Sequence, residues 1–165
     1  MIPFAWLPPL VFFCDSQGDW SAYEEVLYGY FKCDFVLSPP TFRGCRVGLK
    51  RYPLDHGREA TFWHLISEGS VEADRLPHMR RCERIRWPRP MIHGSEDSSL
   101  RVWTQERNGE QRVAIALSDF TYVVILAARA SRDGGYFLPW TAFCVERPHQ
   151  RIKLEREWQK FKLLP

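Results

Sequence analysis

Residues 100–129 read LRVWTQERNGEQRVAIALSDFTYVVILAAR. Asn108-Gly109 lies between two strand-like runs, and this dipeptide favours a two-residue β-hairpin. The run that follows, residues 120–129, is almost continuously apolar, which is typical of a central strand covered on both faces. The stretch therefore predicts a hairpin followed by a central strand.

A further strand is predicted over residues 136–145, YFLPWTAFCV, after the turn ASRDGG. Pro139 cannot donate to a strand ladder, so it indicates an edge position or a bulge. Bulges often redirect side chains near functional sites, which draws attention to Trp140 and Thr141. Together these runs predict a four-stranded antiparallel meander.

Helices are expected on both sides of this sheet. Residues 21–31, SAYEEVLYGYF, have apolar residues at helical spacing and begin with the capping-box pattern Ser21-x-x-Glu24. Residues 149–164 predict a closing helix that docks on the sheet through Leu154, Trp158 and Phe161. Its opposite side carries His149, Lys153, Arg156 and Lys160. The fold class is therefore α+β, with N-terminal helices, a four-stranded antiparallel sheet and a C-terminal helix.

We expect a single domain over residues 1–165, with residues 1–99 forming an arm, helices and a basic tract, and residues 100–165 the sheet and closing helix. The start, MIPFAWLPPLVFF, predicts an extended arm. The following local predictions are made for the connecting segments: a short strand in CRVGLKRY (45–52), helix or strand in TFWHLISEG (61–69), a helix entered near Pro77 within 71–85, and extended chain in WPRPMI (87–92).

Cysteine usage and the N-terminal segment indicate the compartment. Five widely spaced cysteines without a C-x-x-C pair argue against a disulfide framework and favour a reducing environment. The apolar start lacks a basic leader region and is interrupted by prolines, so a signal peptide or membrane span is not expected. The predicted location is cytoplasmic, without membrane association.

Positive charge is concentrated in RLPHMRRCERIRWPRP, residues 75–90, which hold six arginines and one glutamate although the whole chain carries only +3. Guanidinium groups match phosphate oxygens, and Trp87 offers a surface on which a base can stack. The tract therefore favours a polyanionic partner. The alternative is a solvated helix in which Glu83 pairs with a neighbouring arginine.

Candidate chemistry centres on a few polar residues. His64 can exchange protons near neutrality, although a histidine among apolar residues is more often part of the core. Glu68, Glu72 and Asp74 could position arginines or act as a base, and otherwise are loop charges. His78 and Cys82 are the only pair at ligand spacing on one helix, so no metal site is predicted. Phosphate-binding glycine loops are absent, and no cofactor is expected.

These motifs resemble the superfamily that groups barnase, EndoU, colicin-type tRNases and RelE. The resemblance lies in FWHLISEG, DRLPHMRRCERIRWPRPMI, RVAIALSDFTYVVIL and YFLPWTAFCVERPHQRIKLEREW, about 100 of the 165 residues in the expected order. It implies N-terminal helices before a four-stranded sheet that cuts RNA without a metal. It also implies the site residues: His64 as the catalytic histidine, Arg80, Arg81 and Arg84 as phosphate ligands, Thr141 as a hydroxyl beside the phosphate, and His149 and Lys153 as further contacts.

The predicted function is a metal-independent endoribonuclease acting on tRNA or mRNA, the toxin of a toxin–antitoxin or phage-associated system, with Trp87 or Trp103 stacking a base. An antitoxin or immunity protein would then cover the basic face. Two alternatives remain open. One is a non-catalytic nucleic-acid-binding or regulatory protein, and the other is a module whose arginines meet an acidic protein partner. Convergence of His64, the arginines and Thr141 on one site would favour the enzyme.

Overall fold

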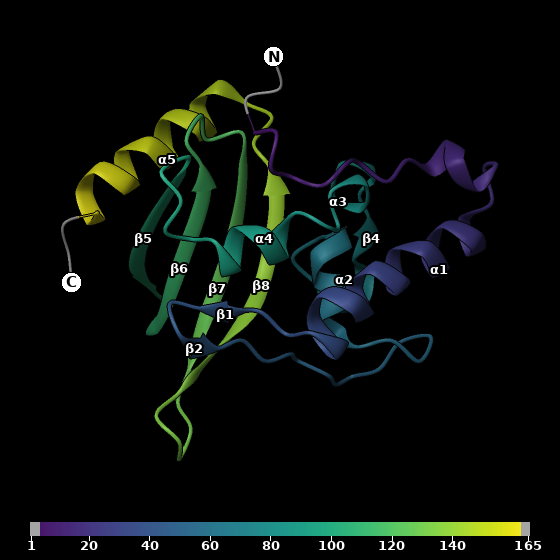
Figure 1. Ribbon diagram of the computed structural model, residues 1–165, viewed down its shortest axis with the longest axis horizontal. Coiled ribbons are helices and arrows are strands. Elements are labelled where there is room, and N and C mark those ends of the chain that lie inside the picture. The colour runs from purple at the N-terminus through teal and green to yellow at the C-terminus, as the bar shows by residue number, and fades with distance from the viewer. Residues whose placement is uncertain (1–3, 163–165) are drawn as a thin grey trace.

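The four strands predicted after residue 100 form one antiparallel sheet. In the computed structural model, which describes residues 4–162, they are β5 (Leu100–Arg107), β6 (Glu110–Leu117), β7 (Tyr122–Arg129) and β8 (Tyr136–Cys144). Each strand pairs with its neighbour in the chain, in the order β5-β6-β7-β8 (Figure 1). The helix α5 (Pro148–Phe161) follows the sheet. The α+β prediction is confirmed.

The predicted hairpin and bulge both occur. Asn108 and Gly109 connect β5 to β6 with φ angles of 53° and 75°, the left-handed conformation that a type I′ turn requires. In the β7–β8 pair the register shifts at Trp140, because Ile125 faces Thr141 whereas Leu126 faces Pro139. Since β8 is also an edge strand, Pro139 removes no hydrogen bond from a central ladder.

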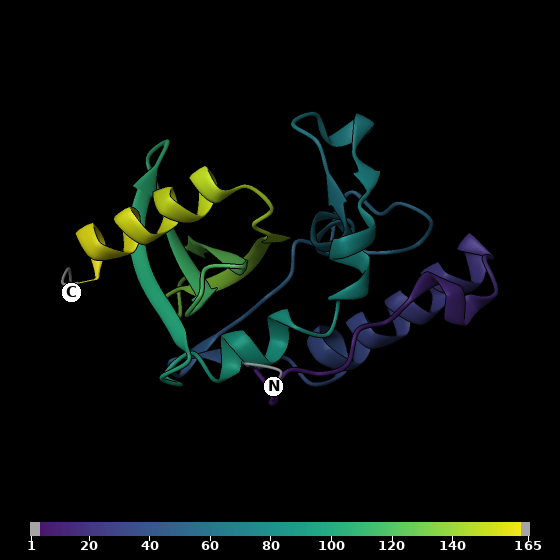
Figure 2. The same cartoon turned by 90° about the horizontal axis from the view of Figure 1, so that it is seen from above.

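Different parts of the chain cover the two faces of the sheet. Leu154, Trp158 and Phe161 of α5 pack on the face that carries Trp103 and Val123, as predicted. The opposite face joins the main core, to which the N-terminal elements contribute. Figure 2 shows α5 and α4 (Pro88–His93) on opposite sides of the sheet, with α2 (Ala60–Ile66) and α3 (Met79–Glu83) beside its β8 edge.

The predicted N-terminal helix is α1 (Trp20–Phe31), which buries Tyr23, Leu27 and Phe31. Its predicted capping box is wrong, because the side chain of Asp19 accepts the hydrogen bond from the Ala22 amide, at 3.2 Å. The predicted arm packs on the domain through Val11, whose amide bonds to the carbonyl of Glu83. Residues 1–3 of that arm lie outside the described residues.

Short elements precede α1 and connect it to the sheet. They are η1 (Phe13–Ser16), η2 (Lys32–Leu37), β1 (Thr41–Phe42), β2 (Cys45–Arg46), β3 (Ser67–Glu68), η3 (Glu72–Asp74) and β4 (Leu76–Pro77). The strand expected over 45–52 is therefore only two residues long, and Val47 then bridges to Phe137 of β8. The ambiguous segment 61–69 divides into the end of α2 and then β3.

Two predictions around the arginine tract are wrong. The helix α3 begins at Met79, after Pro77 has paired with Ser67 in a two-stranded ladder. The segment WPRPMI is helical in α4 and not extended. Its two prolines lie in the first turn of the helix, where an amide hydrogen has no partner within the helix, so the missing donors cost little.

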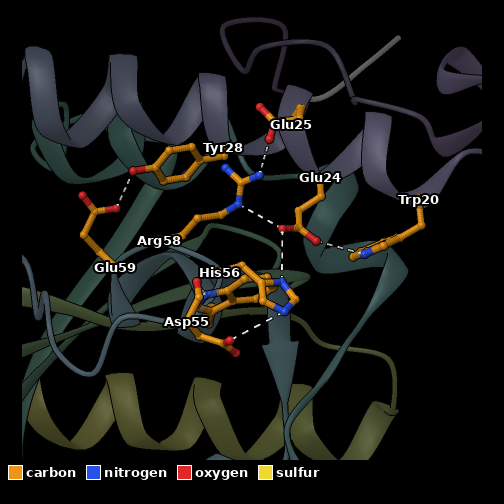
Figure 3. A network of polar contacts seen from close by, with 9 residues as sticks. Trp20, Glu24, Glu25, Tyr28, Asp55, His56, Arg58 and Glu59 are labelled. Carbon is orange, nitrogen blue, oxygen red and sulfur yellow. Dashed lines mark hydrogen bonds and ion pairs between the residues drawn. The ribbon is translucent and has the colours of Figure 1, made fainter.

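Before α2, a network of charged side chains joins this helix to α1 (Figure 3). The Arg58 guanidinium donates to Glu24 at 2.9 Å and to Glu25 at 2.5 Å, and it lies over the ring of Tyr28. The Tyr28 hydroxyl donates to Glu59 at 2.8 Å. Because Arg58 and Glu59 immediately precede α2, the network fixes where that helix begins.

All five cysteines are free. Among residues 4–162, no helix is both long enough and apolar enough to cross a bilayer.

Candidate functional site

His64 lies in the last turn of α2 with its side chain held between two elements. Its Nε2 atom is 3.2 Å from a carboxylate oxygen of Glu72, and its ring lies edge-on to Trp140 of β8. Lys50 reaches the same Glu72 carboxylate at 3.5 Å. Burial lowers the pKa of His64 below its usual value, the hydrogen bond to the Glu72 carboxylate opposes this shift, and the charge of Arg75 adds to it. The neutral imidazole is thereby favoured.

The Glu72 contact also determines which ring nitrogen is free. The hydrogen bond to His64 lowers the pKa of Glu72, so its carboxylate is ionised near neutral pH and only accepts hydrogen bonds. Nε2 of the neutral imidazole must then carry the hydrogen, which leaves Nδ1 as the nitrogen able to take up a proton. This is the arrangement of a base that is oriented by a carboxylate.

The backbone at Ser67, directly after α2, binds two arginines. The Ser67 carbonyl accepts a hydrogen bond from Arg75 at 2.6 Å and another from Arg81 at 2.8 Å. Arg75 also donates to the carbonyls of Gly69 and His64. Two guanidinium groups are therefore anchored within three residues of His64 by neutral oxygen atoms.

Thr141 joins this cluster from the sheet. Its Oγ1 accepts a hydrogen bond from the same Arg81 nitrogen, at 3.0 Å. The preceding residue, Trp140, occupies the bulge, and its ring contacts His64 on α2 and the guanidinium of Arg112 on β6, 4.2 Å from the ring centre. The bulge predicted from Pro139 thus places Trp140 and Thr141 where α2 and α3 meet β8.

The electrostatics of the cluster are unbalanced. Among the described residues, neither Arg75 nor Arg81 has a carboxylate within 4.0 Å. Burial lowers the pKa of both guanidiniums, and the charge of Arg75 lowers that of Arg81 further, while Glu68 acts on both in the opposite sense. Arginine remains protonated in proteins, so two incompletely neutralised positive charges lie beside His64 and Thr141.

Three hollows open around the cluster. His64, Glu72 and Arg75 line one of about 470 Å³. Arg81 lines a second, of about 430 Å³, together with His78 and Phe143. Thr141, Trp140 and Phe143 line a third, of about 300 Å³, beneath α5. Ser67 lines the first hollow, and its carbonyl binds Arg81, which lines the second, although the two hollows have no lining residue in common.

The remaining predicted arginines lie beside this cluster and not in it. Arg80 is exposed and lies 3.6 Å from Glu146. Arg84 follows the end of α3, donates to the Arg80 carbonyl, and lies over Trp87. Neither Arg80 nor Arg84 lines the second hollow, and Arg80 is next to it only through Glu146.

The predicted aromatic and α5 contacts are elsewhere. Trp87 packs on Tyr122 and donates to the Pro8 carbonyl. Trp103 is only 2% exposed and packs between the sheet and α5, which corrects the expectation that its ring stacks on a base. His149 and Lys153 line a separate hollow along the outer side of α5.

Sequence reasoning missed Arg75 and His78 as members of this region. Arg75 belongs to the arginine tract, but the resemblance implies Arg80, Arg81 and Arg84 as the phosphate ligands. His78 was considered only as a metal ligand. The organising group is the Ser67 carbonyl, and a backbone atom leaves no signature in the residue types.

The class defined by these observations is an α+β protein with a histidine, two arginines and a threonine gathered at the edge of an antiparallel sheet. Within residues 4–162 no group of three or more histidine, cysteine, aspartate or glutamate side chains is arranged to hold a metal. Comparison of the chain with protein-family models, curated proteins and solved structures gives no match.

Proposed function

We propose that this protein is a metal-independent endoribonuclease. The observation that carries the proposal is the pair of arginines, Arg75 and Arg81, which lack a carboxylate partner and are anchored beside the base-like His64 and the hydroxyl of Thr141. Both guanidiniums are half-buried, and cations withdrawn from water are normally paired, so unpaired ones beside proton-transferring groups suit an anionic substrate. The resemblance of the sequence motifs to metal-independent ribonucleases supports the same class.

The chemistry follows from the properties of RNA. Nδ1 of His64 takes the proton of a ribose 2′-hydroxyl, and the 2′-oxygen attacks the adjacent phosphorus while the bond to the 5′-oxygen breaks. Arg75 and Arg81 stabilise the charge that develops on the non-bridging oxygens. Thr141, held by Arg81, orients the phosphate. The products are a 2′,3′-cyclic phosphate and a 5′-hydroxyl end.

The rest of the substrate extends across the basic surface. Arg80 and Arg84 flank the scissile phosphate, and Trp87 supplies an aromatic contact next to Arg84. On α5, His149, Lys153, Arg156 and Lys160 lie within one side of the helix and are exposed. We assign this α5 row to the phosphates of a flanking single strand, with tRNA or mRNA as the RNA. A toxin role in the cytoplasm, restrained by a protein that covers the basic surface, is the biological setting proposed for such an activity.

The test is incubation of the purified protein with total RNA and tRNA in excess EDTA, beside a His64→Ala variant, with mapping of the new ends. Cleavage by the wild type alone, leaving cyclic phosphate ends, is the expected result. Salt-dependent RNA retention without cleavage would instead identify a non-catalytic RNA-binding protein, because phosphate contacts alone produce that dependence. Neither cleavage nor retention would direct attention to an acidic protein partner.

A further inference from the structure

We propose that His78 is the general acid of the reaction and protonates the leaving 5′-oxygen. The inference rests on the proposed ribonuclease function and adds to it a second proton-transferring residue. It is drawn from the hollow that His78 shares with Arg81 and from the two carboxylates beside the imidazole ring.

The backbone places His78 next to the candidate site. It lies between β4 and α3, and its amide donates to the Ile66 carbonyl at 2.8 Å. That carbonyl belongs to the residue before Ser67, whose own carbonyl holds Arg75 and Arg81. The imidazole lines the hollow of about 430 Å³ into which Arg81 also faces. The carbonyls of two successive residues, Ile66 and Ser67, therefore hold His78 and the two guanidiniums.

The surroundings of the ring suit a proton donor. Nε2 lies 4.0 Å from Glu68 and 3.9 Å from Glu146, so an imidazolium forms ion pairs with carboxylates on two different segments. At these distances the carboxylates stabilise the charge without a close hydrogen bond that would hold the proton. Nδ1 is buried and has no hydrogen-bond partner among the described residues, so an imidazolium keeps one unpaired N–H there, and only Nε2 has polar neighbours. The charged groups that surround the ring are Glu68, Arg80, Arg81, Glu146 and Arg147.

The two histidines have complementary positions. His64 and Arg75 line one hollow, His78 and Arg81 line another, and the Ser67 carbonyl accepts hydrogen bonds from both arginines. In phosphoryl transfer the attacking and leaving oxygens are roughly in line on opposite sides of phosphorus. A phosphate bound to Arg75 and Arg81 would then present its 2′-oxygen to His64 and its 5′-oxygen to His78. The proton gained by His64 and the proton given by His78 balance, and each histidine is reset by solvent.

The test compares two RNA substrates of one sequence, one ordinary and one with sulfur replacing the leaving 5′-oxygen. A thiolate leaves readily without protonation, because thiols are much stronger acids than alcohols. His78→Ala is expected to slow cleavage of the ordinary RNA by about 10²–10⁴-fold, the usual contribution of general acid–base catalysis. On the sulfur substrate the same variant should approach the wild-type rate, whereas His64→Ala should stay impaired on both.

His78→Gln and thermal unfolding serve as controls. Glutamine keeps a hydrogen-bond donor but cannot act as a comparable acid, so it should resemble His78→Ala on the ordinary RNA. A wild-type rate for either variant on ordinary RNA, recovery by His78→Gln, or an equal defect on both substrates would overturn the role of His78. If the wild-type protein cleaves neither RNA, the proposed ribonuclease function fails first, and that result is distinct from each of these.

Discussion

Arg58 and Arg81 are both largely withdrawn from solvent, yet the protein surrounds them differently. Arg58 meets Glu24 and Glu25 in the network between α1 and α2 (Figure 3). Although burial lowers the pKa of Arg58, the hydrogen bonds from the two glutamates raise it above its usual value. The positive charge of Arg58 is therefore neutralised within the fold by two carboxylates.

Arg81 bonds to the carbonyl of Ser67 and the hydroxyl of Thr141, and both of these oxygens are neutral. Burial and the charge of Arg75 lower its pKa. Arg58 is neutralised within the fold, whereas the charge of the half-buried Arg81 is the one that the proposed function assigns to a ligand. The kind of oxygen that binds each guanidinium, carboxylate or neutral, is the difference between them.

The largest expected effect is on stability, at Arg58. Arg58→Met leaves the buried Glu24 carboxylate without its partner, which should lower the free energy of unfolding by about 3–5 kcal/mol. Arg81→Met removes a half-buried cation whose two hydrogen bonds go to neutral oxygens, so its cost should be smaller, about 1.5 kcal/mol. Urea denaturation of both variants measures the two values. Equal destabilisation would remove the distinction between the two sites.

The next largest effect is on catalytic activity, where Arg81 should matter more than Arg58. Arg81→Met should lower kcat for RNA cleavage by about 10²–10³-fold, the usual loss when a donor that stabilises transition-state charge is deleted. The comparison variant is Arg80→Met, because Arg80 lies on the same helix as Arg81, is exposed, pairs with Glu146 and only flanks the proposed scissile phosphate, so its loss should be smaller. Single-turnover cleavage compares the two. A larger loss in Arg80→Met would assign the phosphate contact to the wrong arginine.

The pH dependence of kcat/KM tests how the surroundings of His64 set the pKa of its imidazole. Because burial lowers the pKa of His64, the active neutral imidazole should persist to a lower pH than for a free histidine. The Glu72 hydrogen bond raises that pKa, so Glu72→Gln should move the acidic limb of the kcat/KM profile to still lower pH. Glu25→Gln, in the Arg58 network, is the control. A shift towards higher pH in Glu72→Gln would contradict this account of His64.

The smallest effect concerns the α5 row. If Lys153 and Lys160 each contact one phosphate, their change to glutamine should reduce the slope of log affinity against log salt by about 0.7 apiece for single-stranded RNA. Lys32, which is exposed and follows α1, provides the control substitution. Fluorescence anisotropy at several salt concentrations gives the slopes. Unchanged slopes would exclude the α5 row from the RNA path.

The sheet was predictable because its signals are local. Asn108-Gly109 specifies a turn, the apolar run of β7 specifies a central strand, and Pro139 marks the bulge. The segments around the arginine tract were not predictable, because tertiary packing determines their secondary structure. Pro77 pairs with Ser67 before α3 begins, and the prolines of α4 are accommodated in a first helical turn.

The candidate site was predictable only in part. His64, Arg81 and Thr141 were selected from their residue types and from the resemblance, and the structure brings all three to one place. Arg75 and His78 were not selected as site residues. The carbonyls of Ser67 and Ile66 position them, and pairing between backbone groups distant in sequence cannot be read from side-chain identities.

The central claim is that Arg75 and Arg81 are held for an external phosphate. The most direct measurement is binding of an oligonucleotide whose deoxyriboses prevent cleavage, by calorimetry at fixed salt, to the wild type, to Arg81→Met and to Arg80→Met. We expect Arg81→Met to weaken binding by about tenfold or more, in keeping with 1.5–3 kcal/mol for a charge-assisted hydrogen bond, while its free energy of unfolding falls by only about 1.5 kcal/mol. Equal affinity of Arg81→Met and the wild type would contradict the claim.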